Sequence, residues 1–501
     1  MEDAWSPLPR LSLSALAHQG SRHPVLRYAP ARQSVGIVHL GLGNFHRAHQ
    51  AVHVDAALAA GESNWAISAW NLRSRELPEA LAAQDGLYTL LVRSTQGTEA
   101  RVLAPIREAG CVAQAPAQFL GRLASSDTRI VSLSITEKGY CLGPDGLLDL
   151  NEPALAADLA GAWPPHTALG WLAAGLAQRH ERHSEARITL LSCDNLSGNG
   201  QALERALDAF LRARSDDALA DRLADIASFP NSMVDRIVPA TTDADRAVAE
   251  QLTGLIDACP VATEPFSQWV IEDRFAAGRP RFEHSGVTFS DDVAGWEQMK
   301  LRLLNAAHSV IAYLGVLAGW RTVAEAVSQP TVNALLNRLW TSEAIPALPH
   351  RLHSSAPGYC AQLLSRFSNT ALAHQTAQIA MDGSKKIPLR WLPTVLTLQQ
   401  RGQAWPVLAL ALAAWIRALE TVSQKDMGTV ARPAIIDPLA TVLAPLARCP
   451  DAAQAVCSVF RAVPGLRILA EHPTACMAVT RALTTLRAEG PQGALQRLTG
   501  V

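Results

Sequence analysis

The segment 296–309 carries four side chains that can exchange protons or hydrogen bonds with a bound molecule: Glu297, Lys300, Asn305 and His308. On an α-helix, at about 100° per residue, they would fall within roughly 140° of one another. Leucines share this arc, and a polar face interleaved with leucines is more typical of a pocket wall than of a wet surface. The pattern therefore predicts one wall of a substrate pocket, and a solvated helix face is the alternative.

A second candidate site lies where an apolar run, Ser34 to Leu40, meets a pair of glycines. Glycines at a strand-to-helix turn let backbone amides approach a pyrophosphate, and the following helix N-terminus adds partial positive charge. The third glycine of the usual fingerprint is absent, because His46 stands there. We predict a dinucleotide turn, with a ligand-free tight turn as the alternative. The predicted cofactor contacts in this turn are Gly41, Gly43, Asn44, Phe45 and Arg47.

The next strand should end in an acidic residue that binds the ribose 2′-hydroxyl, but the stretch 68–73 contains no carboxylate. Asn71 could bond a ribose hydroxyl instead, and Arg73 could accept a 2′-phosphate. These residues alone do not separate NAD from NADP.

The elements that must position these residues change in character along the chain. The first half alternates β-branched apolar runs with helix-like stretches such as His49 to Ala60 and Gln201 to Ala213, which predicts a mostly parallel sheet covered by helices. The expected strands are Ser34–Leu40, Asn64–Trp70, Leu87–Arg93, Arg101–Arg107, Arg129–Thr136 and Arg187–Ser192.

From about Asp292 onward, Ala, Leu and Arg dominate, and Pro and Gly mark helix ends. We expect an α/β Rossmann-type domain at 1–285 and a mostly α-helical substrate and catalytic domain at 286–501. The expected helices of the second domain are Met299–Leu317, Val332–Leu339, Ala371–Ala380, Val407–Leu419 and Ala475–Leu486.

The composition excludes several classes of protein. With 44 basic and 45 acidic side chains in 501 residues, nothing indicates binding to nucleic acid or to an anionic membrane. The first 20 residues lack the pattern of a signal peptide, and the most apolar run, Ala404 to Ile416, is too short to span a bilayer. The eight cysteines form no CxxC pair. We expect reduced thiols, a cytoplasmic location and a monomer or small homo-oligomer.

The sequence resembles the polyol-specific long-chain dehydrogenases, the family of mannitol 2-dehydrogenase and fructuronate reductase. The similar blocks follow one another in order through most of the chain. They are GIVHLGLGNFHRAHQA (36–51), SLSITEKGY (132–140), SCDNLSGNG (192–200), FPNSMVDRIVP (229–239), QWVIEDRFAAGRP (268–280), KLRLLNAAHS (300–309) and IAMDGSKKIP (379–388).

The resemblance implies NAD as cofactor, without excluding NADP, and a polyol, ketose or hexuronate as substrate. It implies that Lys300 is the general acid/base, so burial would have to lower its pKa from the free value of about 10.4. Asn195 and Asn305 would hold the alkoxide or carbonyl oxygen. Glu297 would pass protons between the lysine and solvent. The groups that would bond the other hydroxyls of the substrate are His308, Asp235 and Lys386.

Several of these residues have a structural alternative. Asp235 and Arg236 could form an ion pair, Asn195 could cap a turn, and Lys386 could be solvated. Glu137 and Lys138 end a strand on the nucleotide-binding side without an assigned role.

One predicted substrate residue departs from the family pattern. Gln378 stands where mannitol-oxidising relatives commonly carry an arginine, and an amide cannot make the same charge-assisted bonds. This leaves a hexuronate such as fructuronate open as the substrate.

Two other classes of function compete with this prediction. A zinc-dependent polyol dehydrogenase would need grouped Cys, His or Glu ligands, which the scattered cysteines do not offer, so we expect no metal. A non-catalytic nucleotide sensor would have no use for a lysine flanked by two amides.

Overall fold

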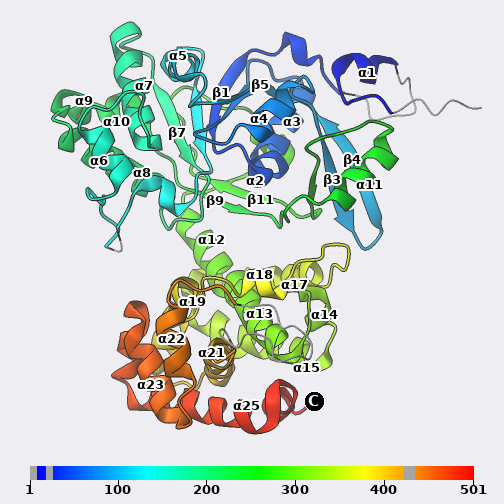
Figure 1. Ribbon diagram of the computed structural model, residues 1–501, viewed down its shortest axis with the longest axis vertical. Helices are drawn as coiled ribbons and strands as arrows, with labels where there is room; N and C mark the ends of the chain where they lie inside the picture. Colours follow the sequence, from blue (N-terminus) through cyan, green and yellow to red (C-terminus); the bar gives the residue numbers. More distant parts are fainter. Residues whose placement is uncertain (1–7, 19–25, 144, 422–434) are drawn as a thin grey trace, which may run out of the picture. The chain divides into compact units, whose positions relative to one another are not determined.

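The computed structural model describes residues 8–18, 26–143, 145–421 and 435–501 (Figure 1). Part of the N-terminal segment that was predicted not to be a signal peptide lies outside these residues. The chain forms two compact units, Met1–Ala294 and Gly295–Val501. The eight cysteines are free thiols, of which four are buried.

The first unit is built on a six-stranded sheet in the order β5-β2-β1-β6-β7-β8. Every neighbouring pair in it runs parallel, as the alternation of strands and helices predicts. The strands are β1 (Val35–Leu40), β2 (Ala66–Asn71), β5 (Ile106–Cys111), β6 (Ile130–Leu133), β7 (Ile188–Ser192) and β8 (Ala227–Ser228).

Side chains that alternate along β1 pack on opposite faces of this sheet. Val38 and Leu40 face one hydrophobic cluster together with residues of α5, α7 and α8, whereas Ile37 faces another cluster that includes residues of α3. The main helices of this unit are α2 (Asn44–Ala48), α3 (Gln50–Ala59), α4 (Glu76–Ala82), α5 (Pro116–Ala124), α6 (Pro153–Leu159), α7 (Ala168–Arg182), α8 (Asn199–Ala213) and α11 (Asp243–Thr253).

Two three-stranded sheets complete the first unit, β10-β3-β4 and β12-β11-β9. The strand predicted at Arg101–Arg107 is wrong, because the chain leaves one sheet and enters another around Pro105, which has no amide hydrogen to donate. The strands are β3 (Tyr88–Ser94), β4 (Gly97–Leu103), β9 (Ser232–Asp235), β10 (Val261–Thr263), β11 (Gln268–Ile271) and β12 (Thr288–Phe289).

The second unit is helical throughout its described residues apart from turns and one isolated bridge, and its helices share one hydrophobic cluster. Helix α21 is buried along nearly its whole length, and α25 packs along it. The main helices are α12 (Val293–Met299), η5 (Lys300–Asn305), α13 (Ala306–Ala318), α14 (Val323–Val327), α15 (Pro330–Arg338), η6 (Leu339–Ala344), α17 (Ala356–Phe367), α18 (Thr376–Ile379), α19 (Gly383–Arg390), α20 (Leu392–Gln400), α21 (Pro406–Leu419), α22 (Ala440–Ala447), α23 (Ala452–Ala462) and α25 (Pro473–Thr499).

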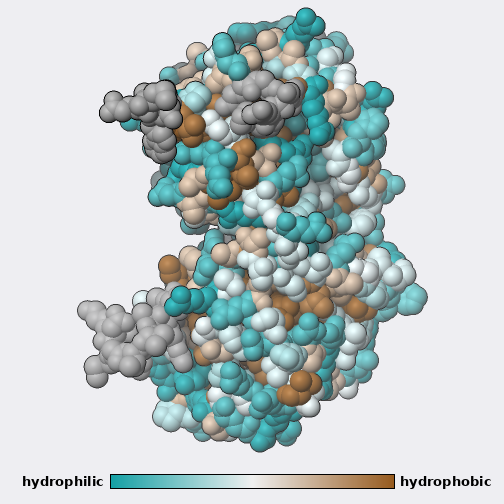
Figure 2. Space-filling view, turned by 90° about the vertical axis from the view of Figure 1, so that its right-hand side faces the viewer, coloured by the Kyte–Doolittle hydropathy of each residue, from teal (hydrophilic) through white to brown (hydrophobic). Residues whose placement is uncertain are grey.

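The helix predicted over Ala371–Ala380 is mostly wrong, because only the four residues of α18 are helical there. By length and composition, one helix of the described chain, at 293–318, could cross a membrane, or two if the bent pair at 452–470 is counted. In the first of these, 78% of the apolar window is buried, as in the core helix of a globular protein. On the face drawn in Figure 2, hydrophobic residues form small groups among hydrophilic ones.

Candidate functional site

The carboxyl ends of β1 and β6 mark the place where the order of the main sheet reverses. From β1 the chain continues to β2 on one side, and it later returns to place β6 on the other side. In open parallel sheets, ligands bind in the crevice at such a switch point. The predicted glycine turn, residues 41–47, follows β1 directly and therefore borders this crevice.

The two glycines of the turn meet different structural requirements. Gly41 has a φ of +106°, and a Cβ there would lie 2.2 Å from the carbonyl oxygen of Ser134, so the fold itself requires it. At Gly43 the backbone is extended, and a Cβ would meet nothing closer than 3.8 Å. The fold leaves open space at Gly43, in the position where the fingerprint admits a pyrophosphate.

An imidazole occupies the place of the third glycine. His46 is buried and stacks on His39 of β1 with ring centroids 3.4 Å apart, while His39 contacts the hydroxyls of Ser132 and Ser134. The stacked ring packs the helix against the strand, which is the role of the third glycine elsewhere. The helix after the turn is interrupted at His49, so α2 has only five residues and its dipole is correspondingly short.

The side chains of two predicted cofactor residues, Arg47 and Asn44, form hydrogen bonds to other groups of the protein. Arg47 is 2% exposed, and its guanidinium donates to the carbonyl of Cys259 and to Oδ1 of Asn44. The Asn44 amide in turn donates to the hydroxyl of Thr241 at 3.1 Å. We therefore expect Arg47 and the Asn44 side chain to support the turn from behind, which leaves contact with a cofactor to the backbone.

Phe45 and Asn71 lie at the edge of the same region. Phe45 is half-buried and stacks on His49 with centroids 5.1 Å apart. Asn71 is the last residue of β2, where its carbonyl accepts from the amide of Val112 at 2.8 Å. Its position at a carboxyl strand end next to β1 is the place expected for the residue that bonds a ribose hydroxyl.

Asn195 and Asp235, the predicted substrate residues of the first unit, also follow strands. Asn195 is exposed and lies three residues after the end of β7 at Ser192. Asp235 is the buried last residue of β9 and pairs in register with Gln268. The neighbouring Arg236 guanidinium donates to the backbone carbonyls of Ala48 and Glu264.

The segment with Lys300 is not an α-helix, which corrects the geometry assumed from the sequence. Residues Lys300–Asn305 form a π-helix between α12 and α13. Hydrogen bonds in a π-helix join residues five apart, so Lys300 and Asn305 stand one turn apart on one face. The α-helical spacing would separate them by about 140°. π-helical turns are rare and occur frequently at functional sites.

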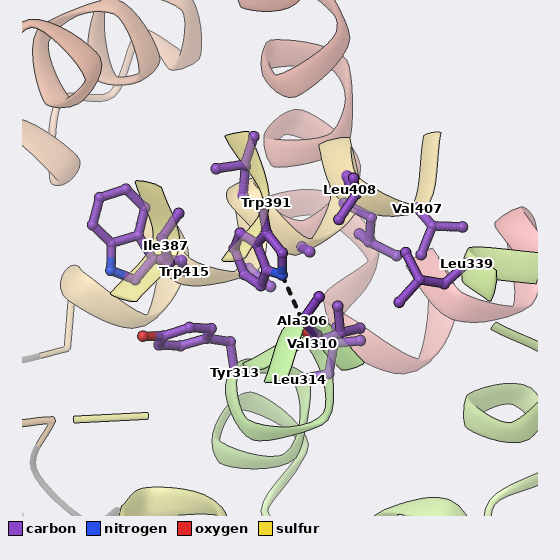
Figure 3. Close-up of a cluster of buried hydrophobic side chains, with 14 of the residues drawn as sticks. Ala306, Val310, Tyr313, Leu314, Leu339, Ile387, Trp391, Val407, Leu408 and Trp415 are labelled. Atoms are coloured by element: carbon purple, nitrogen blue, oxygen red, sulfur yellow. Dashed lines mark hydrogen bonds between the residues drawn. The ribbon is translucent and has the colours of Figure 1, made fainter. Parts of the chain in front are cut away.

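Backbone carbonyls at the end of the π-helix are bound by side chains from neighbouring helices. The indole of Trp340 donates to Leu303 at 3.1 Å, and Trp391 donates to Ala306 at 3.1 Å, as the dashed line in Figure 3 shows. Arg390 donates to the carbonyl of Asn305 at 3.3 Å. These bonds satisfy carbonyls that the wide turn displaces, and they fix its geometry.

His308 lies in the first turns of α13 with a buried ring. Its pKa is well below the usual value because of desolvation first, and then because His374, Arg366 and Arg390 are nearby. Within the described chain, its Nε2 atom is buried without a hydrogen-bond partner. A neutral imidazole with an unused nitrogen can bond a hydroxyl of a substrate.

Lys386 and Gln378 belong to short helices beside the π-helix. Lys386 lies on α19, which packs against η5, and the exposed Gln378 lies on α18, which packs against α13. In the second unit, Glu297, Lys300, Asn305 and His308 thus follow one another along α12, η5 and α13, and Lys386 and Gln378 lie on short helices that pack against η5 and α13. Their joint arrangement with Asn195 and Asp235 of the first unit stays a prediction.

Comparisons with known proteins fit this arrangement. The mannitol dehydrogenase Rossmann domain matches residues 35–284, and the mannitol dehydrogenase C-terminal domain matches residues 292–454. The chain belongs to the mannitol dehydrogenase family. The predicted family and fold class are therefore confirmed, and the chain is an oxidoreductase.

Relatives within the family carry different names. D-mannonate oxidoreductase of Escherichia coli is 40% identical over 81% of this chain and 84% of its own length. A mannitol 2-dehydrogenase of Phaeosphaeria nodorum is 40% identical over 78% of this chain and 70% of its own. The solved ternary complex of Pseudomonas fluorescens mannitol 2-dehydrogenase with NAD and D-mannitol is 35% identical, covers 98% of this chain and 99% of that one, and gives a TM-score of 0.86.

Sequence reasoning missed three features of this chain. The π-helix leaves no periodicity that can be told from an α-helix over six residues. The stack of His39 and His46 joins residues on different elements. The buried carboxylate of Asp194 accepts hydrogen bonds from residues 135, 136 and 140, and its only sequence signal was its place directly before Asn195.

Proposed function

We propose that this chain is an NAD-dependent dehydrogenase that interconverts a secondary alcohol of a polyol and the corresponding ketose, without a metal, using Lys300 as general acid/base. The observation that carries the proposal is the glycine turn at the switch point of the main sheet, where the fold leaves Gly43 unobstructed. The solved relative with NAD and D-mannitol supports the choice of cofactor and substrate class.

The first unit would hold the cofactor at the carboxyl edge of its main sheet. The backbone at Gly43 fits the pyrophosphate, since no side chain fills the space there, and Asn71 fits a ribose hydroxyl. NAD supplies the chemistry of hydride transfer. The protein supplies position and electrostatics, and NADP remains the alternative through Arg73.

The second unit would supply the proton transfer. Lys300 takes the hydroxyl proton during alcohol oxidation and returns it during ketone reduction, and Glu297 relays that proton to solvent. The amides of Asn305 and Asn195 donate to the oxygen as negative charge develops on it, with no need to reorganise. His308, Asp235, Lys386 and Gln378 bind the remaining hydroxyls. The π-helix supports this assignment because it places Lys300 and Asn305 one turn apart.

A hexuronate is the second candidate substrate, as in fructuronate reduction. After burial, the neighbours that lower the pKa of His308 are three basic side chains: His374, Arg366 and Arg390. Burial and Arg366 lower the pKa of His374 to about 4, so the permanent positive charge here comes from the arginines. A positive field around the substrate histidine favours a carboxylate ligand. The E. coli relative named D-mannonate oxidoreductase supports this alternative.

A substrate panel decides between the two candidates. We expect oxidation of mannitol, sorbitol or D-mannonate with NAD, or reduction of the matching ketose or fructuronate with NADH, read by nicotinamide absorbance. A kcat/KM at least about tenfold higher for the hexuronate pair would favour the carboxylate substrate, because one charge-assisted bond is worth that much. Running each substrate with NADP as well tests the cofactor choice. If the protein turned over none of these substrates, the proposal would be contradicted.

Activity is expected to be independent of metal. Among the residues described here, no group of three or more His, Cys, Asp or Glu side chains could hold a metal ion, and the proposed lysine needs none. Dialysis against a strong chelator should leave kcat unchanged. Loss of activity that zinc restores would overturn the lysine assignment. A cytoplasmic location and a monomer or small homo-oligomer, with no nucleic-acid or membrane partner, stay predictions.

A further inference from the structure

The loop after β6, residues 134–140, contains a strained residue beside the glycine turn. Thr136 has φ +66° and ψ 165°, a conformation that is essentially restricted to glycine and is costly for a β-branched side chain. The hydroxyl of Ser134 donates to the carbonyl of Gly41 at 2.9 Å, which ties this loop to the turn. Strain of this kind persists only where the surroundings impose it.

A single carboxylate imposes that conformation. Asp194, which follows β7, accepts hydrogen bonds from the backbone amide of Thr136 at 2.8 Å and of Ile135 at 3.1 Å. It also accepts from the hydroxyl of Tyr140 at 2.7 Å, so it holds both ends of the bend. Asp194 is 8% exposed, and desolvation raises its pKa. Because burying a charged carboxylate costs free energy, we infer that the burial of Asp194 is tied to its hydrogen bonds with the loop.

The strained part of the loop faces outward at the carboxyl edge of the sheet. Thr136, Glu137 and Lys138 are exposed, although the carboxylate that binds the backbone amide of Thr136 is buried. β6 lies next to β1, so this loop and the glycine turn border the same crevice. Strained backbone concentrates at ligand clamps, where it is part of pre-organisation.

We propose that Asp194 is a positioning residue of the cofactor site. Its carboxylate holds the loop 134–140 in the shape that borders the bound dinucleotide, and it fixes the start of the segment that carries Asn195. This inference rests on the proposed function, because it requires that the crevice between β1 and β6 binds NAD.

The main test replaces Asp194 by asparagine. The amide keeps the shape but offers one acceptor oxygen, and in either orientation its NH₂ group faces the backbone N–H of Ile135 or of Thr136, which cannot accept from it. We expect Asp194→Asn to raise the Kd of NADH, measured by fluorescence titration, by about tenfold or more, and to raise the KM of NAD together with a fall in kcat. Asp194→Glu should restore part of the affinity.

Asp158 provides a matched control in the same unit. Asp158 is 2% exposed, and its carboxylate accepts from the amides of His166 and Thr167 and from the Thr167 hydroxyl, with the His166 ring 3.2 Å away, so it is also a buried carboxylate with several partners. It lies within α6 rather than after a strand of the main sheet. Asp158→Asn should lower Tm while the Kd of NADH stays within about twofold of the wild type.

Two further variants keep the test decisive if Asp194→Asn does not fold. Tyr140→Phe removes one of the three donors and should weaken NADH binding several-fold. Thr136→Gly removes the strain, so Tm should hold or rise while NADH binds more weakly, because the free loop gains conformations. A merely structural role would change Tm in these variants without changing the Kd of NADH, and that result would overturn the inference. If wild-type protein does not bind NADH, the proposed function itself fails.

Discussion

Lys300→Met should lower kcat by at least about 10², the lower end for loss of a general acid/base. Methionine keeps most of the side-chain volume without the ammonium, so packing around the π-helix is largely preserved. The Kd of NADH should stay near the wild-type value, because the glycine turn belongs to the first unit and Lys300 to the second. Steady-state kinetics and a fluorescence titration measure the two effects.

The pH profile identifies the base. Alcohol oxidation needs the deprotonated lysine, so kcat/KM should rise with pH through one ionisation below the free-lysine value of about 10.4. Ketone reduction needs the protonated form, so its kcat/KM should fall over the same range. Both features should disappear in Lys300→Met and in Lys300→Ala.

His308 is the competing base, and its surroundings disfavour it. Burial and three neighbouring basic side chains lower the pKa of His308, so its imidazole binds a proton weakly at neutral pH. A pH profile that survives in Lys300→Met would nevertheless move the proton transfer to His308. In that case the chain would still be a dehydrogenase, and only the role of the lysine would be lost.

The sequence predicted the elements that are set by local chemistry. The β-branched runs became β1, β2, β3, β6 and β7 within a few residues, because strand periodicity and flanking turns are local. Pairing partners are not local, and β3 joins a separate sheet with β4 and β10. The division of the run at Pro105 also depends on that pairing.

The residues of the candidate site could be predicted from the sequence, but the distant residues that hold them in place could not. Lys300 and Asn305 were identified from the segment, yet the carbonyls at the end of the π-helix are bound by Trp340, Arg390 and Trp391. These lie 37, 85 and 85 positions along the chain from the residues they bond. Arg47 was predicted to contact the cofactor because it follows the glycines, and only the fold shows its guanidinium directed to Cys259. Distant partners of this kind leave no pattern in a single sequence.

The two glycines of the turn should separate cofactor binding from folding. At Gly41 any side chain would need a positive φ and would overlap the carbonyl of Ser134, so Gly41→Ala should cost at least about 2 kcal/mol of unfolding free energy. Denaturant unfolding, followed by circular dichroism, measures that loss.

At Gly43 the expected loss is in affinity. The backbone there is extended, which valine tolerates, and a Cβ meets no protein atom closer than 3.8 Å, so Gly43→Val should unfold at nearly the wild-type denaturant midpoint. Its branched side chain would fill the space that the pyrophosphate needs, so the KM of NAD should rise by about tenfold or more, and Gly43→Ala should give a smaller rise. Native stability with unchanged affinity for NADH in Gly43→Val would show that the dinucleotide does not approach this turn. The cofactor site would then have to be sought away from the end of β1.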